Sequence, residues 1–125
     1  MKSLTLEQII AIHALLIGET GGSDGLRDIG RLESVVATQT QEVFGTELYK
    51  TVYEKAAALM RCIIADHPFV DGNKRTGILA SLAFLDINGR TAGFTQKELE
   101  DFAVRVVVDH LDIEIIATWL KDHSN

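Results

Sequence analysis

The sequence predicts a single all-α domain built from six helices. Apolar residues recur every three or four positions in several separate stretches, which is the spacing of an amphipathic helix. No two neighbouring segments show the strict alternation of a convincing strand pair. The 125 residues are 46% hydrophobic and 24% charged, with one proline and no repeat or low-complexity tract. One compact domain spanning residues 1–125 is therefore expected.

The first predicted helix opens with a capping box, in which the side chains of Thr5 and Gln8 bond to each other's backbone. Helical spacing continues to Gly18, carried by Leu6, Ile9, Ile10, His13, Leu16 and Ile17. Residues 18–25 read GETGGSDG, and because four of these eight residues are glycine, we expect a loop there.

Two weaker elements follow this loop. Asp28 is placed to cap a second helix, whose apolar positions are Leu32, Val35 and Val36. Residues 40–48 show no dominant periodicity, and we interpret them as a loop or a short hairpin.

The two strongest helical patterns lie in the middle of the chain. The first covers about residues 51–65, with Ala56, Leu59, Met60, Ile63 and Ile64 at helical spacing. The second covers about residues 74–88 and ends at Asn88-Gly89. Because it is apolar nearly all round, it is expected in the middle of the core.

Two further helices complete the chain. Thr95 and Glu98 form a second capping box, which opens a helix through Val108. Asp112 is placed to cap a last helix that runs through Trp119.

Charge and cysteine content exclude several classes of protein. The chain has 12 Lys and Arg against 18 Asp and Glu, a formal net charge of −6 at pH 7, which argues against nucleic-acid binding over the whole surface. Cys62 is the only cysteine, so neither an internal disulfide nor a cysteine-based zinc site is possible. The start of the chain lacks a signal-peptide pattern, and no apolar run approaches the ~20 residues of a membrane helix. A cytoplasmic protein without membrane or direct nucleic-acid partners is expected.

One segment between the two central helices carries residues suited to chemistry. Residues 67–77 read HPFVDGNKRTG. Because proline disfavours the helical conformation of the residue before it, the first of these helices should end near His67 and present that side chain beside a loop. The next helix should begin near Lys74. Its first backbone N–H groups lack partners within the helix and attract anions, and Lys74 and Arg75 add two positive charges.

The loop residues themselves suit a polyphosphate bound together with a metal ion. Gly72 permits backbone turns that other residues resist, so successive N–H groups can form a phosphate cradle. Asp71 supplies a carboxylate beside it, and Mg²⁺ is commonly held by one or two carboxylates plus substrate phosphates. Histidine side chains ordinarily change charge near neutral pH, so His67 is suited to take a proton from an attacking hydroxyl. The residues alone leave a plainer interpretation open, in which Asp71-Gly72 is a turn and Asn73 only a helix cap.

The same segment resembles the signature of the Fic/Doc superfamily, whose Fic branch reads H-P-F-x-[D/E]-G-N-G-R-x-x-R. The matching residues, in order, are His67, Pro68, Phe69, Asp71, Gly72, Asn73 and Arg75. Lys74 replaces a glycine of this pattern and Ile78 replaces its second arginine, and both departures are those of the Doc (death-on-curing) branch, H-x-F-x-D-x-N-K-R-T. Residues 21–36, GGSDGLRDIGRLESVV, are similar to a G-x-R-D…L-E-S segment of Doc-like toxins, so the resemblance covers most of the chain.

The resemblance implies a six-helix Fic/Doc-type domain that uses ATP. Fic proteins mostly transfer AMP to a protein hydroxyl, whereas Doc-type toxins are kinases that phosphorylate a threonine of the elongation factor EF-Tu and stop translation. Carried over to this chain, the general base is His67, the Mg²⁺ ligand is Asp71, and the phosphates are held by Gly72, Asn73, Lys74 and Arg75. A lysine in place of glycine narrows the cradle and adds a point charge, and the missing arginine removes a phosphate clamp. Both changes favour transfer of the γ-phosphate.

The expected role is that of a toxin in a toxin–antitoxin pair, with two alternatives. One is a Fic-type AMP transferase, and the other is a catalytically weak relative that binds its antitoxin and tunes repression of its operon. The inhibitory [S/T]-x-x-x-E-[G/N] helix of many Fic enzymes is absent, since no Glu is followed by Gly or Asn. Inhibition is therefore expected in trans, by a small antitoxin lying as a helix over the nucleotide groove, although an unregulated enzyme is the plainer alternative.

Other residues receive structural interpretations. His13 lies on the apolar face of the first helix and is expected in the core or in a groove. Cys62 is expected to be a small buried hydrophobe, and Trp119 to anchor the last helix. Arg27 and Asp28 either line the groove, or serve as a cap (Asp28) with its ion-pair partner (Arg27).

Overall fold

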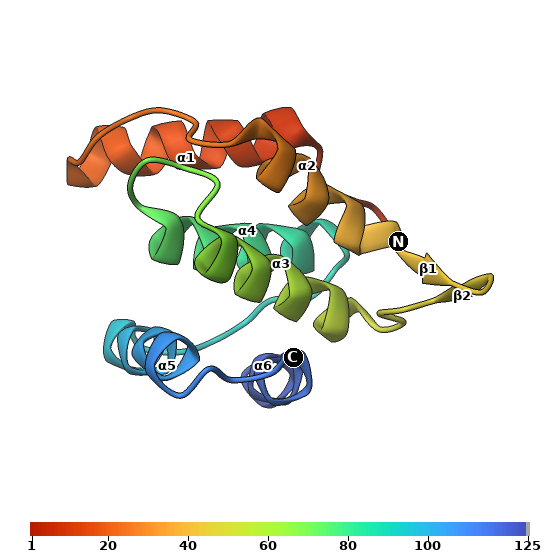
Figure 1. Cartoon of the computed structure of the whole chain (residues 1–125). Coiled ribbons are helices and arrows are strands. Elements are labelled where there is room, and N and C mark those ends of the chain that lie inside the picture. Colours follow the sequence, from red (N-terminus) through yellow and green to blue (C-terminus); the bar gives the residue numbers. More distant parts are fainter. Residues whose placement is uncertain (125) are drawn as a thin grey trace.

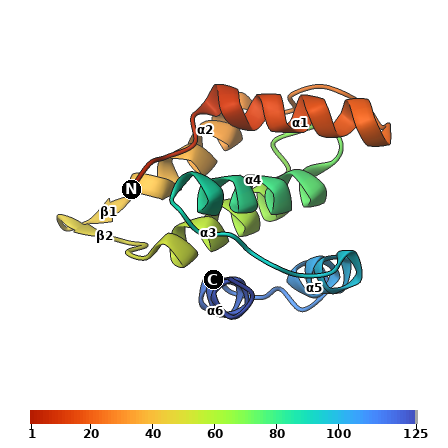
Figure 2. The ribbon, with the colours of Figure 1, turned by 180° about the vertical axis from the view of Figure 1, so that it is seen from behind.

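The computed structural model describes residues 1–124 and confirms the all-α prediction. Within these residues the helices are α1 (Leu6–Thr20), α2 (Ile29–Ala37), α3 (Val52–Asp66), α4 (Asn73–Ile87), α5 (Gln96–Val108) and α6 (Ile113–Asp122). Figure 1 shows them in three tiers, with α1 and α2 uppermost, α3 and α4 in the middle, and α5 and α6 below; Figure 2 shows the same tiers from behind. The longest of these helices have 15 residues, fewer than the roughly 20 that cross a bilayer, so none of them is suited to span a membrane.

Side-chain caps start five of the six helices in this part of the chain. The capping oxygens belong to Thr5, Asp28, Thr51, Thr95 and Asp112. Both predicted capping boxes are present, with Gln8 and Glu98 returning a bond to the N-cap backbone. The exception is α4, whose N-cap is Gly72 and which therefore begins without a side-chain cap.

The central helix of the fold is α3, which packs against α2, α4, α5 and α6. The prediction that α4 lies in the middle is only partly right, because α4 packs between α1 and α3 and leaves Leu79 exposed on its outer side. Gly77 allows α3 and α4 to approach closely, since a Cβ added there would lie 3.0 Å from the carbonyl oxygen of Met60. This close contact fixes the distance between the two helix ends that the loop of residues 67–72 connects.

The first helix ends later than predicted. Instead of stopping at Gly18, α1 continues to Thr20, whose hydroxyl donates a hydrogen bond of 2.8 Å to the carbonyl of Leu16. The helix stops at Gly21, which has a positive φ of 81°. A glycine inside a helix costs only about 1 kcal/mol, so Gly18 alone does not end it. The last helix, α6, also runs three residues beyond the predicted Trp119.

Residues 40–48 form a short hairpin rather than a loop. A 3₁₀ turn (Thr38–Thr40) leads into β1 (Glu42–Val43), which pairs antiparallel with β2 (Thr46–Glu47). The two residues between the strands, Phe44 and Gly45, both have positive φ, as a tight two-residue hairpin turn requires. The buried Lys55 ties the hairpin to α3, because its ammonium donates to the Gln39 carbonyl and to the Glu47 carboxylate.

The lowest tier is held together by stacked rings. The indole of Trp119 on α6 stacks on Phe102 of α5, with ring centroids 4.1 Å apart, and on His123, with centroids 4.0 Å apart. Trp119 therefore anchors the last helix as predicted.

Candidate active site

A cleft of about 420 Å³ lies where the C-terminus of α3 and the N-terminus of α4 meet. It is lined by all six residues that were predicted to form the site: His67, Asp71, Gly72, Asn73, Lys74 and Arg75. Val70 and the end of α1 complete the wall, through Leu16, Ile17, Thr20 and Gly21. This contribution of α1 was not predicted, because nothing in the spacing of these residues shows that they face the loop across the fold.

A larger groove, of about 930 Å³, lies at the opposite end of α3 and runs along α6. Its charged lining residues are two acids and two bases, Glu54, Glu114, Arg90 and Lys121, and it contains no histidine. The smaller cleft is the candidate active site, because a titratable imidazole, a carboxylate and two cations converge there.

His67 lies directly after the last residue of α3, and its backbone is strained. It caps α3 in the left-handed conformation, with φ 49° and ψ 60°, and its N–H donates a hydrogen bond of 3.2 Å to the carbonyl of Ile63. A non-glycine residue pays roughly 1–2 kcal/mol for this conformation. The following proline contributes to this, since Pro68 disfavours the right-handed helical region at His67, where the helix ends. The side chain is consequently exposed at the cleft, as predicted.

The imidazole of His67 is held by one long contact, to Asn73. The Asn73 amide is oriented independently, because its Oδ1 accepts from the Phe69 N–H at 3.0 Å and its Nδ2 donates to the Phe69 carbonyl at 2.9 Å. Nδ2 also faces Nδ1 of His67 at 3.4 Å, which favours the tautomer with its proton on Nε2. In that tautomer Nε2 has no lone pair, so this contact has to break and Nδ1 has to carry the proton before Nε2 can accept one. The buried Asn73 side chain thus braces the loop and is not the N-cap of α4, which is Gly72.

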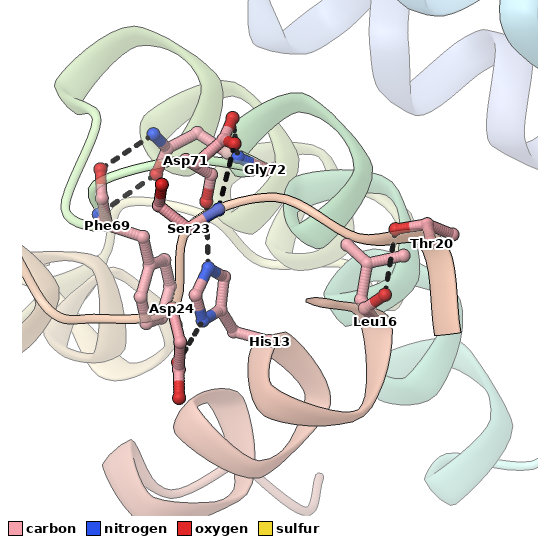
Figure 3. A network of polar contacts seen from close by, with 9 residues as sticks. His13, Leu16, Thr20, Ser23, Asp24, Phe69, Asp71 and Gly72 are labelled. Atoms are coloured by element: carbon pink, nitrogen blue, oxygen red, sulfur yellow. Dashed lines mark hydrogen bonds and ion pairs between the residues drawn. The ribbon is translucent and has the colours of Figure 1, made fainter. Parts of the chain in front are cut away.

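Asp71 is held by backbone groups from both sides, as Figure 3 shows. Its Oδ1 accepts the N–H of Gly72 at 2.8 Å, and its Oδ2 accepts the N–H of Ser23 at 3.2 Å. The carbonyl of Asp71 accepts a hydrogen bond of 2.7 Å from Nε2 of His13, whose ring stacks on Phe69 with centroids 3.9 Å apart. His13 is only 2% exposed, which confirms its predicted structural place. The partnership with Ser23 was missed, because it joins residues 48 positions apart.

The carboxylate of Asp71 fits a cation whose other ligands are substrate phosphates and water. Each carboxylate oxygen accepts one N–H and keeps a lone pair free for a cation. Residues 1–124 contain no group of three or more His, Cys, Asp and Glu side chains that could hold a metal ion by themselves. A single carboxylate suits Mg²⁺, which is usually bound by one or two carboxylates together with substrate phosphates and water.

The start of α4 presents positive charge to the same cleft. Lys74 and Arg75 are exposed in its first turn, which contains no acidic residue. The backbone N–H groups of residues 73–75 make no hydrogen bond within residues 1–124, and the left-handed Gly72, at φ 75°, turns the chain so that the helix begins there. Ile78 stands at the position of the second arginine of the Fic pattern, is 6% exposed and packs into the core. This position therefore offers no positive charge to the cleft.

Arg27 and Asp28 have different partners from those predicted. Neither lines the cleft. Asp28 caps α2 as proposed, but its ion pair, at 3.4 Å, is with Arg31, so the predicted pairing with Arg27 is wrong. Arg27 instead extends to the end of α3, where its guanidinium donates to the carbonyls of His67 at 2.7 Å and Asp66 at 3.1 Å. An isolated bridge between Leu26 and Phe69 places this segment alongside the loop and accounts for the difference.

Cys62 takes no part in the cleft. It lies half-buried against the core, on the side of α3, which agrees with the predicted structural role. Burial, with a smaller contribution from the negative charge of Asp66, raises the pKa of the Cys62 thiol. A raised pKa keeps the thiol protonated at neutral pH and poorly nucleophilic.

Comparisons with known proteins agree with this geometry. A sequence model of the Fic/DOC family matches residues 3–85, which include α1 to α3, the whole loop and most of α4. The chain is similar to "Toxin Doc" of Mycolicibacterium smegmatis, with 38% identity over 102 residues, 80% of this chain and 78% of that protein. It is also similar to "Protein kinase doc" of Escherichia phage P1, with 30% identity over 121 residues, 97% of this chain and 94% of that protein.

Proposed function

Because this chain belongs to the Fic/Doc family, we propose that it is the toxin of a toxin–antitoxin pair and acts as a protein kinase. The proposed reaction transfers the γ-phosphate of ATP to a threonine hydroxyl of a translation factor, EF-Tu, and so arrests translation. The names of the two relatives support the toxin role and the kinase activity respectively, and the threonine and EF-Tu are the finer part of the proposal.

The observation that carries the proposal is the convergence of three kinds of group in one cleft. An exposed imidazole, a carboxylate with free lone pairs, and an uncapped helix N-terminus bearing two cations all face a space of about 420 Å³. Phosphoryl transfer requires little covalent participation by the protein, so positioning and charge neutralisation supply most of the catalysis. These residues supply both.

In the proposed mechanism, His67 takes the proton of the threonine hydroxyl as its oxygen attacks the γ-phosphorus. The new O–P bond forms while the bond from the γ-phosphorus to the β–γ bridging oxygen breaks, and ADP leaves with that oxygen. His67 keeps the proton until solvent removes it. The contact with Asn73 is long, at 3.4 Å, so it breaks easily when the imidazole turns toward the incoming hydroxyl.

Charge on the phosphates is met by the start of α4. In the proposal, the N–H groups of residues 73–75 and the side chains of Lys74 and Arg75, which line the cleft, hold the phosphates of ATP. Asp71 would hold Mg²⁺ through its free lone pairs. When bound, Mg²⁺ supplies charge neutralisation on the transferring group.

Two features support phosphate transfer over AMP transfer. Lys74 adds a side chain and a point charge where the Fic branch has glycine. Ile78 lies in the core, so the position of the second Fic arginine offers no clamp for the nucleotide. Both differences alter how a triphosphate can lie along the start of α4.

We further propose that a small antitoxin inhibits the protein in trans by covering this cleft. The inhibitory motif of single-chain Fic enzymes is absent from residues 1–125, which supports a blocking segment supplied by another chain. Co-expression with the antitoxin is expected to restore growth. Co-expression with an antitoxin variant that lacks the cleft-binding segment is expected to leave growth arrested.

The decisive experiment uses ATP labelled separately at the α- and γ-phosphates, incubated with this protein and purified EF-Tu. We expect label on EF-Tu from γ-labelled ATP only, at a threonine identified by mass spectrometry. Transfer of the α-label would establish the AMP transferase instead. Absence of any label, despite growth arrest on expression, would show that EF-Tu is not the target.

A further inference from the structure

A short segment before and within α2 grips the backbone at which α3 ends. Nε of Arg27 donates to the carbonyl of His67 at 2.7 Å, and Nη2 of Arg27 donates to the carbonyl of Asp66 at 3.1 Å. Nη1 of Arg31 donates to the same Asp66 carbonyl at 2.7 Å. We call Arg27 and Arg31 the arginine clamp. Both residues come from a part of the chain about 35 to 40 positions away from the carbonyls that they hold.

Backbone groups of the same segment extend this grip by one residue. The carbonyl of Pro68 accepts the N–H groups of Arg27 at 2.8 Å and of Asp28 at 3.0 Å. The N–H of Val70 donates to the carbonyl of Gly25 at 3.0 Å. Three consecutive carbonyls, those of residues 66, 67 and 68, are therefore all bonded to one segment outside the loop.

The arginine clamp bonds the last carbonyls of α3, which have no partners within the helix. The last carbonyls of a helix lack partners within it, and Pro68 cannot continue the helix. Two guanidinium groups at this end also complement the negative pole of α3. Within residues 1–124 the imidazole of His67 has one polar contact, of 3.4 Å, so the backbone that carries the ring sets its position more than the ring's own bonds do.

We infer that Arg27 and Arg31 are positioning residues of the reaction, which fix the backbone of His67 so that its imidazole meets the substrate hydroxyl. This inference rests on the proposed function, in which His67 is the general base. Arg27 is the more important of the two, because it bonds two carbonyls, including that of His67 itself. Arg31 bonds one, and Asp28 holds its guanidinium at 3.4 Å.

The test compares kinetics of γ-phosphate transfer to EF-Tu for the wild type, Arg27→Ala, Arg27→Lys and Arg31→Ala. Displacing a catalytic group by about 1 Å costs roughly 100-fold in rate, so kcat of Arg27→Ala should fall by about that factor. The KM for ATP should stay within about twofold, because the guanidinium does not line the cleft. Arg27→Lys, which keeps the charge but loses the forked donor, should recover part of the loss, and Arg31→Ala should lose less than Arg27→Ala.

A second readout follows the His67 ring without any substrate. The ¹⁵N and ¹H signals of its imidazole, assigned by comparison with His67→Ala, should move in Arg27→Ala and stay in place in Arg105→Ala. Arg105 is a matched control, because it is an exposed arginine on α5 that pairs only with Asp109 within residues 1–124. If Arg27→Ala does not fold, the Arg27→Lys comparison carries the test.

The outcomes separate this inference from the proposed function. Wild-type kcat together with unmoved His67 signals in Arg27→Ala or, where it does not fold, in Arg27→Lys would overturn the inference. A raised KM for ATP at unchanged kcat would also overturn it, by assigning Arg27 to nucleotide binding. If the wild type transfers no γ-phosphate, the proposed function fails, and the ring signals alone still decide whether the clamp positions His67.

Discussion

His67 and Asp71 lie four residues apart in one loop, yet the fold holds them in different ways. The backbone of His67 is gripped through its carbonyl by the arginine clamp, while its ring stays exposed with one long contact. At Asp71 the carboxylate itself is fixed, by the N–H groups of Gly72 and Ser23, above the buried ring of His13. In the proposed function, the residue that moves a proton has an exposed side chain on a backbone held from outside the loop, whereas the residue that holds a cation has both carboxylate oxygens bonded.

The strongest test of this comparison removes the ring that the clamp presents. His67→Ala should lower γ-phosphate transfer by about 10² to 10⁴-fold, the usual contribution of a general base, and should abolish growth arrest on expression. His110→Asn is the matched control, since His110 is an exposed histidine with a positive φ of 48°, which asparagine tolerates, and it lies outside the cleft. Growth arrest that persists in His67→Ala would favour the antitoxin-binding alternative.

The other end of the loop is tested by removing charge but not shape. Asp71→Asn keeps an oxygen that can accept the Gly72 N–H, but it weakens the site for a cation. Activity should fall by at least about 100-fold, and the Mg²⁺ concentration for half-maximal rate should rise. Asp86→Asn, on the exposed side of α4, removes the same charge outside the cleft and should change neither value. An unchanged Mg²⁺ requirement in Asp71→Asn would remove this residue from the metal site.

Stability should respond more at the Asp71 end, because that end rests on a buried ring. His13→Phe keeps an aromatic ring to stack on Phe69 but leaves the carbonyl of Asp71 without its donor. The free energy of unfolding, measured by urea denaturation, should fall by about 1 kcal/mol, the usual net contribution of one hydrogen bond. Stability equal to the wild type would mean that the hydrogen bond contributes little.

A substitution at Gly22 would displace the Asp71 carboxylate without changing Asp71 itself. A Cβ added there would lie 2.7 Å from Oδ2 of Asp71, at a φ of 112° that already disfavours side chains. Gly22→Ala should therefore reduce activity by about tenfold and stability by about 1–2 kcal/mol. Gly89→Ala carries a similar strain, at φ 79°, but meets nothing within 4 Å, so it should lose stability without losing activity. Equal activity in the two variants would show that the Asp71 carboxylate tolerates displacement.

The smallest effect is expected far from the loop, in the lowest tier. The N–H of Thr95, its hydroxyl and then His123 lower the pKa of the Glu98 carboxyl below its ordinary value of 4.5. The folded state therefore favours the ionised carboxylate of Glu98. The stability that this adds is fully present above the ordinary pKa of 4.5, and it is lost as the pH falls through the lower pKa of the folded state. Glu98→Gln should flatten the decline of melting temperature below pH 4.5. Parallel melting curves for variant and wild type would contradict this.

Much of the site followed from the sequence because its residues are neighbours in the chain. His67 and Arg75 are eight positions apart, and Pro68 alone is enough to end α3 and expose the imidazole. What could not be predicted is which groups hold these residues. Ser23 and Asp71 are 48 positions apart in the sequence, and Arg27 and His67 are 40 positions apart. The periodicity of the sequence predicts neither contact.

Local rules also failed where a tertiary contact offered a better partner. One of the two interpretations of Arg27 paired it with its neighbour Asp28, but its guanidinium bonds the carbonyls at the end of α3, and Asp28 pairs with Arg31. In the same way, Asn73 gives its amide to the backbone of Phe69 instead of capping α4. In both cases the side chain satisfies backbone groups that no helix pairs, at the end of α3 for Arg27 and in the loop after it for Asn73.

The sequence by itself determined the helix starts, the break at Pro68, and the order of imidazole, carboxylate and cations along the loop, because each depends on bonds within about four residues. Only the tertiary structure decided that α3 is the centre, that the end of α1 forms the second wall of the cleft, and that His67 is held through its backbone and Asp71 through its carboxylate. These outcomes depend on contacts between distant segments, which form only when the close packing of α3 against α4 at Gly77 brings the helix ends together.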